Sequence, residues 1–76
     1  MKTYLFPVEI EQEEDGRWSA WVEILPGCAV WGYTKQQTLE ALKEAAQAYI
    51  EVLLEEGRSV PEGVETLDTP IVAVMV

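Results

Sequence analysis

The sequence contains no histidine and only one cysteine. Cys28 therefore cannot form a disulfide within the chain, and a zinc site of Cys and His ligands is excluded. Histidine is also the residue most often used as a general base and as the partner of a nucleophilic serine or cysteine. These absences argue against a disulfide scaffold, a zinc domain and a triad hydrolase.

The chain also has few basic residues. Five basic residues stand against 14 acidic ones, which gives a formal net charge of −9. A surface this acidic repels phosphate backbones and anionic lipid, so we expect no direct binding to nucleic acid or to a membrane. A basic protein would be attracted, although excess acid also serves simply to keep a small protein soluble.

Long apolar runs are absent as well. No run approaches the roughly 20 residues of a transmembrane helix, and the N-terminus does not have the pattern of a signal peptide. With one unpaired thiol, this predicts a cytoplasmic protein. The 76 residues predict a single domain, 1–76, whose core is small enough that self-association would be a natural way to stabilise it.

The first half of the chain alternates between apolar and polar residues, as half-buried strands do. This pattern predicts strands over residues 3–12, 17–24 and 29–33. Pro7 cannot donate to a strand ladder, so we expect an edge or a bulge there.

Glycine marks the expected turns. Asp15-Gly16 predicts a hairpin between the first two strands, and Pro26-Gly27 predicts the centre of a type II turn before the third. Gly32, inside the third strand, predicts a bend or a close approach of another backbone.

The period then changes to that of a helix over residues 35–56. Thr34 and Gln37 fit a capping box at its start, Gly57 fits the position after its end, and Pro61 prevents its resumption. One apolar stripe recurs at three- and four-residue steps, formed by Leu39, Leu42, Ala46, Tyr49, Ile50 and Leu53.

A loop over residues 59–65 leads to a fully apolar segment, 71–76, which reads as a strand buried on both faces. The order β-β-β-α-β predicts an α+β fold of two layers, with one helix packed on a four-stranded sheet. One helix cannot cover both faces of such a sheet. We therefore expect the final strand to meet another chain, in a dimer or a tetramer.

The densest group of carboxylates is Glu9, Glu11, Glu13, Glu14 and Asp15. Paired carboxylates can bind Mg²⁺ or carry out acid–base chemistry, but they equally form a solvated strand and turn. Cys28, as a nucleophile, lacks a histidine to generate its thiolate, and a small buried residue is the favoured interpretation. We expect no enzyme activity, no cofactor and no metal.

Three tryptophans are many for 76 residues. Trp18 is explained as a core residue by the alternation of its strand. Trp21 and Trp31 are candidates for a protein interface, since base-stacking platforms usually lie in basic grooves and these surroundings are acidic.

An ordered set of motifs resembles the HicB-like antitoxin family over residues 4–61. The set comprises Asp15-Gly16-x-Trp18-x-Ala20-x-Val22, Leu25-Pro26-Gly27-Cys28, Gly32-x-Thr34, Leu39-Glu40, Lys43-Glu44-Ala45, Glu55-Glu56-Gly57 and Val60-Pro61.

The resemblance implies a degraded ribonuclease-H-like fold without catalytic function. Such antitoxins neutralise a small basic HicA toxin, an mRNA-cleaving ribonuclease, by covering its active site. The residues expected to contact the toxin are Glu11, Glu13, Glu14, Asp15 and Trp31. Those expected to line an interface between copies are Trp21, Val72, Val74 and Val76.

The chain departs from the family pattern in three places. Tyr33 stands where many relatives have aspartate, and Ala41 where many have asparagine. Many relatives also carry a C-terminal DNA-binding segment, whereas this sequence stops at Val76 with the last strand. We therefore do not expect operator binding.

Two other functions stay open. The same fold without a cognate toxin would be an orphan oligomeric scaffold, which the gene neighbourhood would distinguish. A residual metal-dependent nuclease would use the carboxylates of residues 9–15 with a distant acid such as Glu23 or Glu44.

Overall fold

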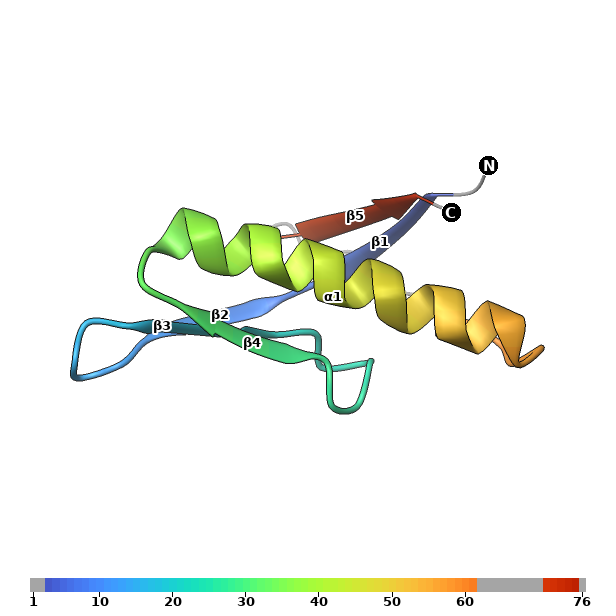
Figure 1. Cartoon of the computed structure of the whole chain (residues 1–76), viewed down its shortest axis with the longest axis horizontal. Coiled ribbons are helices and arrows are strands. Elements are labelled where there is room, and N and C mark those ends of the chain that lie inside the picture. Colours follow the sequence, from blue (N-terminus) through green and yellow to red (C-terminus); the bar gives the residue numbers. More distant parts are fainter. Residues whose placement is uncertain (1–2, 62–70, 76) are drawn as a thin grey trace.

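The computed structural model describes residues 3–61 and 71–75. One long helix lies across a set of antiparallel strands, and β1 and β5 run side by side next to the ends of the chain (Figure 1). The elements are β1 (Thr3–Pro7), β2 (Glu9–Gln12), β3 (Trp18–Trp21), β4 (Ala29–Gly32), α1 (Lys35–Glu55) and β5 (Ile71–Met75). This is the predicted two-layer α+β fold.

The first predicted strand is two strands, β1 and β2, which are interrupted at Val8. β1 pairs with β5, whereas β2 pairs with β3 and β3 with β4, all antiparallel. In place of the single predicted four-stranded sheet, β1 and β5 form a two-stranded ladder, and β2, β3 and β4 form a three-stranded ladder. The two ladders are connected where β1 continues into β2. Pro7, which has no N–H to donate, ends β1 at the junction.

Both predicted turns are present. At the first, the Glu13 N–H donates to the Arg17 carbonyl at 2.7 Å, and Gly16 has a φ of 92°. A three-residue loop thus closes the hairpin, with glycine in the left-handed position that this loop requires. At the second, the Cys28 N–H donates to the Leu25 carbonyl at 2.9 Å across Pro26 and Gly27.

The helix has the ends that its sequence predicts. Thr34 Oγ1 accepts from the Gln37 N–H at 3.0 Å, which is one of the two bonds of a capping box. At the other end Gly57 has a φ of 69°, and the Arg58 N–H donates to the Leu53 carbonyl at 2.9 Å in a Schellman motif. Among the described residues, no helix is both long and apolar enough to cross a bilayer.

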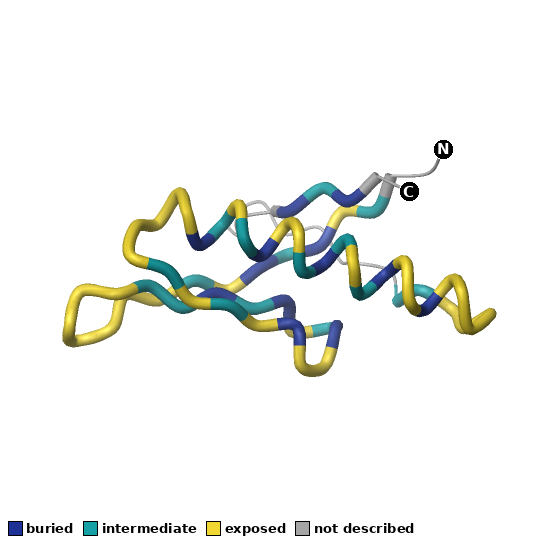
Figure 2. Tube along the Cα trace, viewed as in Figure 1, coloured by how far each residue is buried: buried dark blue, intermediate teal, exposed yellow. Residues whose placement is uncertain are grey.

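The core lies between α1 and the sheet, where the buried positions of the strands and the helix face each other (Figure 2). Its largest fully buried side chains are Phe6, Val8, Val22, Leu25, Thr38, Leu42, Ile50 and Val74. The buried Thr38 hydroxyl donates to the Thr34 carbonyl at 2.7 Å, so its polar group is satisfied. Trp18 is half-buried and lies outside this cluster, so the interpretation of Trp18 as a core residue was wrong.

Gly32 makes the close approach that the sequence predicts. A Cβ at this position would lie 2.6 Å from Thr38 Oγ1 and 3.3 Å from the Thr38 backbone nitrogen. The absence of a side chain therefore lets β4 lie directly against the first turn of α1.

The final strand is present as predicted, and it packs within the chain. Val72 and Val74 are 6% and 0% exposed because they pack in the chain's own core, where β5 contacts α1. Their predicted role at an interface between copies stays a prediction. Val76 and most of the predicted 59–65 loop lie outside the described residues.

Candidate functional site

The side of the three-stranded sheet that faces away from α1 carries acidic and aromatic residues in register. Because side chains alternate along a strand, the buried Ala20 points toward the helix, and its neighbours Ser19 and Trp21 point to the other side. Pairing then forms two rows across β2, β3 and β4, namely Glu9–Trp21–Ala29 and Glu11–Ser19–Trp31. We call this surface, extended by the loop between β2 and β3, the outer face.

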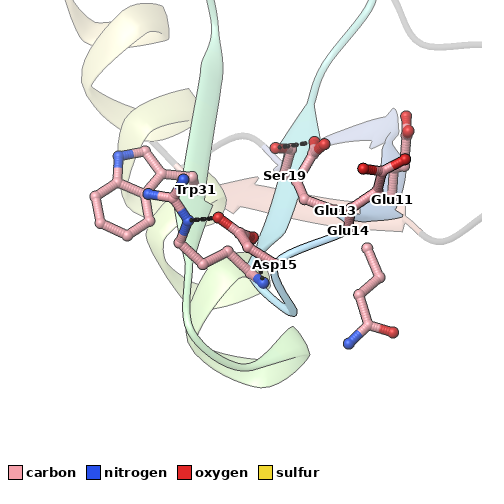
Figure 3. A pocket seen from close by; sticks show the side chains of 8 residues that line it. Glu11, Glu13, Glu14, Asp15, Ser19 and Trp31 are labelled. Atoms are coloured by element: carbon pink, nitrogen blue, oxygen red, sulfur yellow. Dashed lines mark hydrogen bonds and ion pairs between the residues drawn. The ribbon is translucent and has the colours of Figure 1, made fainter.

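At the hairpin end of the outer face lies an open depression of about 730 Å³ (Figure 3). The structure brings together here all five residues that were predicted to contact a toxin. The lining residues are Glu11, Gln12, Glu13, Glu14, Asp15, Arg17, Ser19 and Trp31. They come from β2, the hairpin loop, β3 and β4, so the pairing register assembles the site.

Hydrogen bonds fix two of the carboxylates. The Ser19 hydroxyl donates to Glu13 Oε1 at 2.8 Å. Asp15 Oδ1 accepts from the Arg17 N–H at 3.0 Å, and its Oδ2 accepts from Arg17 Nε at 2.7 Å. The Arg17 backbone N–H, helped by the Arg17 guanidinium, lowers the pKa of the Asp15 carboxyl below its ordinary value. Asp15 is therefore held ionised and oriented.

The aromatic side chains at the depression are exposed to solvent, and contacts with neighbouring side chains hold them in place. Trp31 is 56% exposed, and the Arg17 guanidinium carbon lies 5.1 Å from the centre of its ring. Tyr33, 70% exposed, meets Trp31 edge-to-face with ring centres 5.4 Å apart. Large rings held in this way at the surface are typical of protein-binding hot spots, because they offer contact area at a low entropic cost.

The charge of the site suits a positively charged ligand. It carries four carboxylates and one guanidinium, and the guanidinium is already paired with Asp15. The carboxylates do not converge on one point, and within the described residues no group of three or more Asp, Glu, His or Cys could hold a metal ion. The depression is therefore open and acidic overall.

Cys28 lies away from this surface and is 5% exposed. Burial raises the pKa of its thiol, which favours the thiol over the nucleophilic thiolate. The favoured interpretation of Cys28 as a small buried residue agrees with this placement.

Sequence reasoning missed Arg17, Ser19 and Gln12 as members of the site. The alternation of the strand places Ser19 and Trp21 on one face, and this was the sequence signal that could have found Ser19. The pairing of Ser19 with Trp31 could not be predicted in this way, because the two residues are far apart in the chain. Trp21, predicted at an interface between copies, is half-buried on the outer face between Glu9 and Ala29. It therefore belongs to the same surface as Trp31.

Comparisons with known proteins agree on one family. Residues 6–72 match the family described as HicB_like antitoxin of bacterial toxin-antitoxin system. A UPF0150 protein of Thermoplasma acidophilum is 41% identical over 56 residues, which cover 74% of this chain and 81% of that protein. A UPF0150 protein of Synechocystis is 36% identical over 59 residues, covering 78% and 75% respectively.

The fold has solved counterparts. The N-terminal domain of the Burkholderia pseudomallei antitoxin HicB superposes with a TM-score of 0.74 at 22% identity, covering 95% of this chain and 96% of that domain. The longer structure of the same antitoxin gives a TM-score of 0.73, and the match covers 62% of it. The resemblance seen in the motifs is thus confirmed, and the chain belongs to the HicB-like antitoxin family.

Proposed function

We propose that this protein is an antitoxin that neutralises a small basic HicA-type mRNA ribonuclease by covering its active site. The family supports a toxin–antitoxin role. The observation that carries the finer proposal is the outer face, where four carboxylates and an exposed tryptophan line the same depression.

Charge and shape have separate tasks in this proposal. The carboxylates attract the basic toxin and select its orientation during encounter. Trp31 then provides the anchor that is desolvated on binding. An mRNA ribonuclease needs a basic surface to hold the phosphate backbone, so an acidic surface that occupies it competes directly with the substrate.

The chain's own part in this mechanism is steric and electrostatic, with no chemical step. Cys28 is buried, and among the described residues no group of three or more Asp, Glu, His or Cys could hold a metal ion. We propose that residues 1–76 act as one domain in the cytoplasm, where mRNA and its nucleases meet.

The test is a calorimetric titration of the small basic protein encoded beside this gene, together with rescue of growth on co-expression. Trp31→Ala should weaken binding by at least about tenfold, as truncation of a hot-spot residue does. The double variant Glu11→Lys/Glu14→Lys should weaken it further and abolish rescue.

A matched control separates the outer face from net charge. Glu44→Lys/Glu51→Lys makes the same charge change on exposed positions of α1, which packs on the opposite side of the sheet. It should bind and rescue nearly as the wild type does. Equal loss in both double variants would contradict a specific role of the outer face. Absence of binding, or of any neighbouring toxin gene, would favour an orphan scaffold.

A further inference from the structure

The acidic depression of the outer face already holds one positively charged group, the side chain of Arg17. Its Nε donates to Asp15 Oδ2 at 2.7 Å, and its guanidinium carbon lies over the Trp31 ring, 5.1 Å from the ring centre. Of the described residues that line the depression, Arg17 is the single basic one beside four carboxylates. Its contacts therefore mark a position for a guanidinium between a carboxylate and an aromatic ring.

Such a position suits a guanidinium better than an ammonium. A guanidinium is planar, so it donates N–H groups in its plane to a carboxylate while its face contacts a ring. It is also more weakly hydrated than an ammonium, and it therefore loses less when the ring displaces water from it. Asp15 and Trp31 offer the carboxylate and the ring at one place, so we expect this position to prefer arginine over lysine.

The carboxylate and the ring do not depend on the Arg17 side chain for their placement. Asp15 Oδ1 accepts from the Arg17 backbone N–H at 3.0 Å, a bond that stays when the side chain leaves. Trp31 lies in β4, is paired with Ser19 of β3, and meets Tyr33 edge-to-face with ring centres 5.4 Å apart. The position is therefore preformed for a guanidinium from another chain.

The Arg17 side chain is weakly held in this position. Its side chain and that of Asp15 are each 50% exposed, and ion pairs this exposed stabilise a fold little because water and salt screen them. The Arg17 backbone is fixed separately, since its carbonyl accepts from the Glu13 N–H at 2.7 Å. The side chain can therefore turn into solvent without a change in the hairpin. A partner's arginine that docking shields from water interacts more strongly with the same carboxylate.

We propose that the Arg17 side chain occupies the position of a partner's arginine, which displaces it when the partner docks on the outer face. In the complex the partner's guanidinium donates to Asp15 and lies over Trp31, while Arg17 turns outward. Asp15 and Trp31 give the preference for arginine, and Arg17 is an internal competitor that weaker cations do not displace. That the partner is a basic protein rests on the proposed function, whereas the chemistry of the position does not.

Two small probes, Nα-acetyl-arginine amide and Nα-acetyl-lysine amide, test the position without a partner. Each is titrated into the full chain at constant ionic strength and followed by NMR at the Trp31 indole N–H. Arg17→Gln should bind the arginine amide at least about threefold more tightly than it binds the lysine amide, and more tightly than the wild type does by a similar factor. Arg58→Gln is the matched control, because it removes the same charge from a 65% exposed side chain beyond the end of α1, and it should behave as the wild type. Equal affinities for the two amides, no response in Arg17→Gln, or equal binding by Arg17→Gln and the wild type would overturn the proposal.

Calorimetric titration with the neighbouring basic protein gives a second reading. Arg17→Gln should bind it at least about threefold more tightly than the wild type, and Arg58→Gln should change the affinity less. Weaker binding by Arg17→Gln would refute the displacement, because it would assign Arg17 a direct contact with the partner. If the wild type does not bind this protein at all, the proposed function fails, and the amide titration still decides the chemistry of the position.

Discussion

The two sides of the three-stranded sheet are made by alternate residues of the same short strands, yet they differ in almost every property. The side toward α1 carries the small and aliphatic residues Ala20 and Val30 together with the half-buried Trp18, and Gly32 has no side chain at all where the helix begins. The outer face carries Trp31 beside carboxylates, with more than half of its side-chain surface exposed.

Substitutions on the two sides should therefore affect the stability of the fold to different degrees. Buried positions are constrained by volume, so changes there reduce stability by several kcal/mol. Surface positions away from special contacts change stability by roughly 0.5 kcal/mol or less. Trp31 is 56% exposed and contacts Arg17 and Tyr33 at the surface, so its truncation should reduce stability far less than a change in the core does.

Val74→Asp should have the largest effect. Val74 is 0% exposed beneath α1, and a carboxylate placed there would be buried without a partner. The expected loss of about 4 kcal/mol or more approaches the whole stability of a small domain. Circular dichroism should show an unfolded chain. Leu5→Asp is the control, because Leu5 is 40% exposed in the paired strand, and it should leave the chain folded. A cooperatively folded Val74→Asp would show that β5 is not part of the core.

Gly32→Ala should destabilise the chain by roughly 2 kcal/mol, because its Cβ would overlap Thr38 Oγ1. The measurement is urea denaturation of both single variants and of the double variant. Thr38→Ala removes the overlapping oxygen, so Gly32→Ala should cost less in that background. Thr38→Ser keeps the oxygen and should give no relief. Additive single effects would contradict a direct clash.

Thr34→Ala should cost about 1 kcal/mol through the loss of the bond from the Gln37 N–H. Thr34→Ser, which keeps the hydroxyl, should be close to the wild type. Thermal melts followed by circular dichroism suffice for this comparison. Equal melting temperatures for Thr34→Ala and the wild type would show that the cap does not stabilise α1.

The smallest effect concerns Asp15 on the outer face. Its pKa is lowered in the folded chain, so its contribution to stability is present above the ordinary carboxyl pKa and is lost as the pH falls through the lowered value. The Arg17 backbone N–H is the main cause, and Arg17→Gln keeps it. An NMR titration should therefore find the Asp15 pKa still lowered in Arg17→Gln, though by less. Complete return to the ordinary value would assign the shift to the guanidinium instead.

Local signals predicted much of the fold. The helix begins and ends within one residue of its predicted bounds, because Thr34 and Gly57 act through bonds to near neighbours. Both turns are where their glycines indicate. The division of the first strand was missed, since Phe6 and Val8 keep the same alternation through the break and only the partners of β1 and β2 differ.

The sequence predicted several residues of the site, but not how the strands bring them together. Glu11 and Glu13 stood out as an acidic group, and Trp31 as an aromatic without a core role. That Ser19 and Arg17 join them depends on the pairing register between β2, β3 and β4, to which residues far apart contribute. The apolar sequence predicted that Val72 and Val74 are buried, but it does not say that α1 of the same chain covers them.

The most direct test of the division between the two sides is an NMR titration of the chain with the neighbouring basic protein, read at its indole N–H groups. The three tryptophans give three reporters, of which Trp21 and Trp31 lie on the outer face and Trp18 follows the alternation of the helix side. We expect large shifts for Trp31 and Trp21 and a small shift for Trp18. A large shift at Trp18 with none at Trp31 would contradict it.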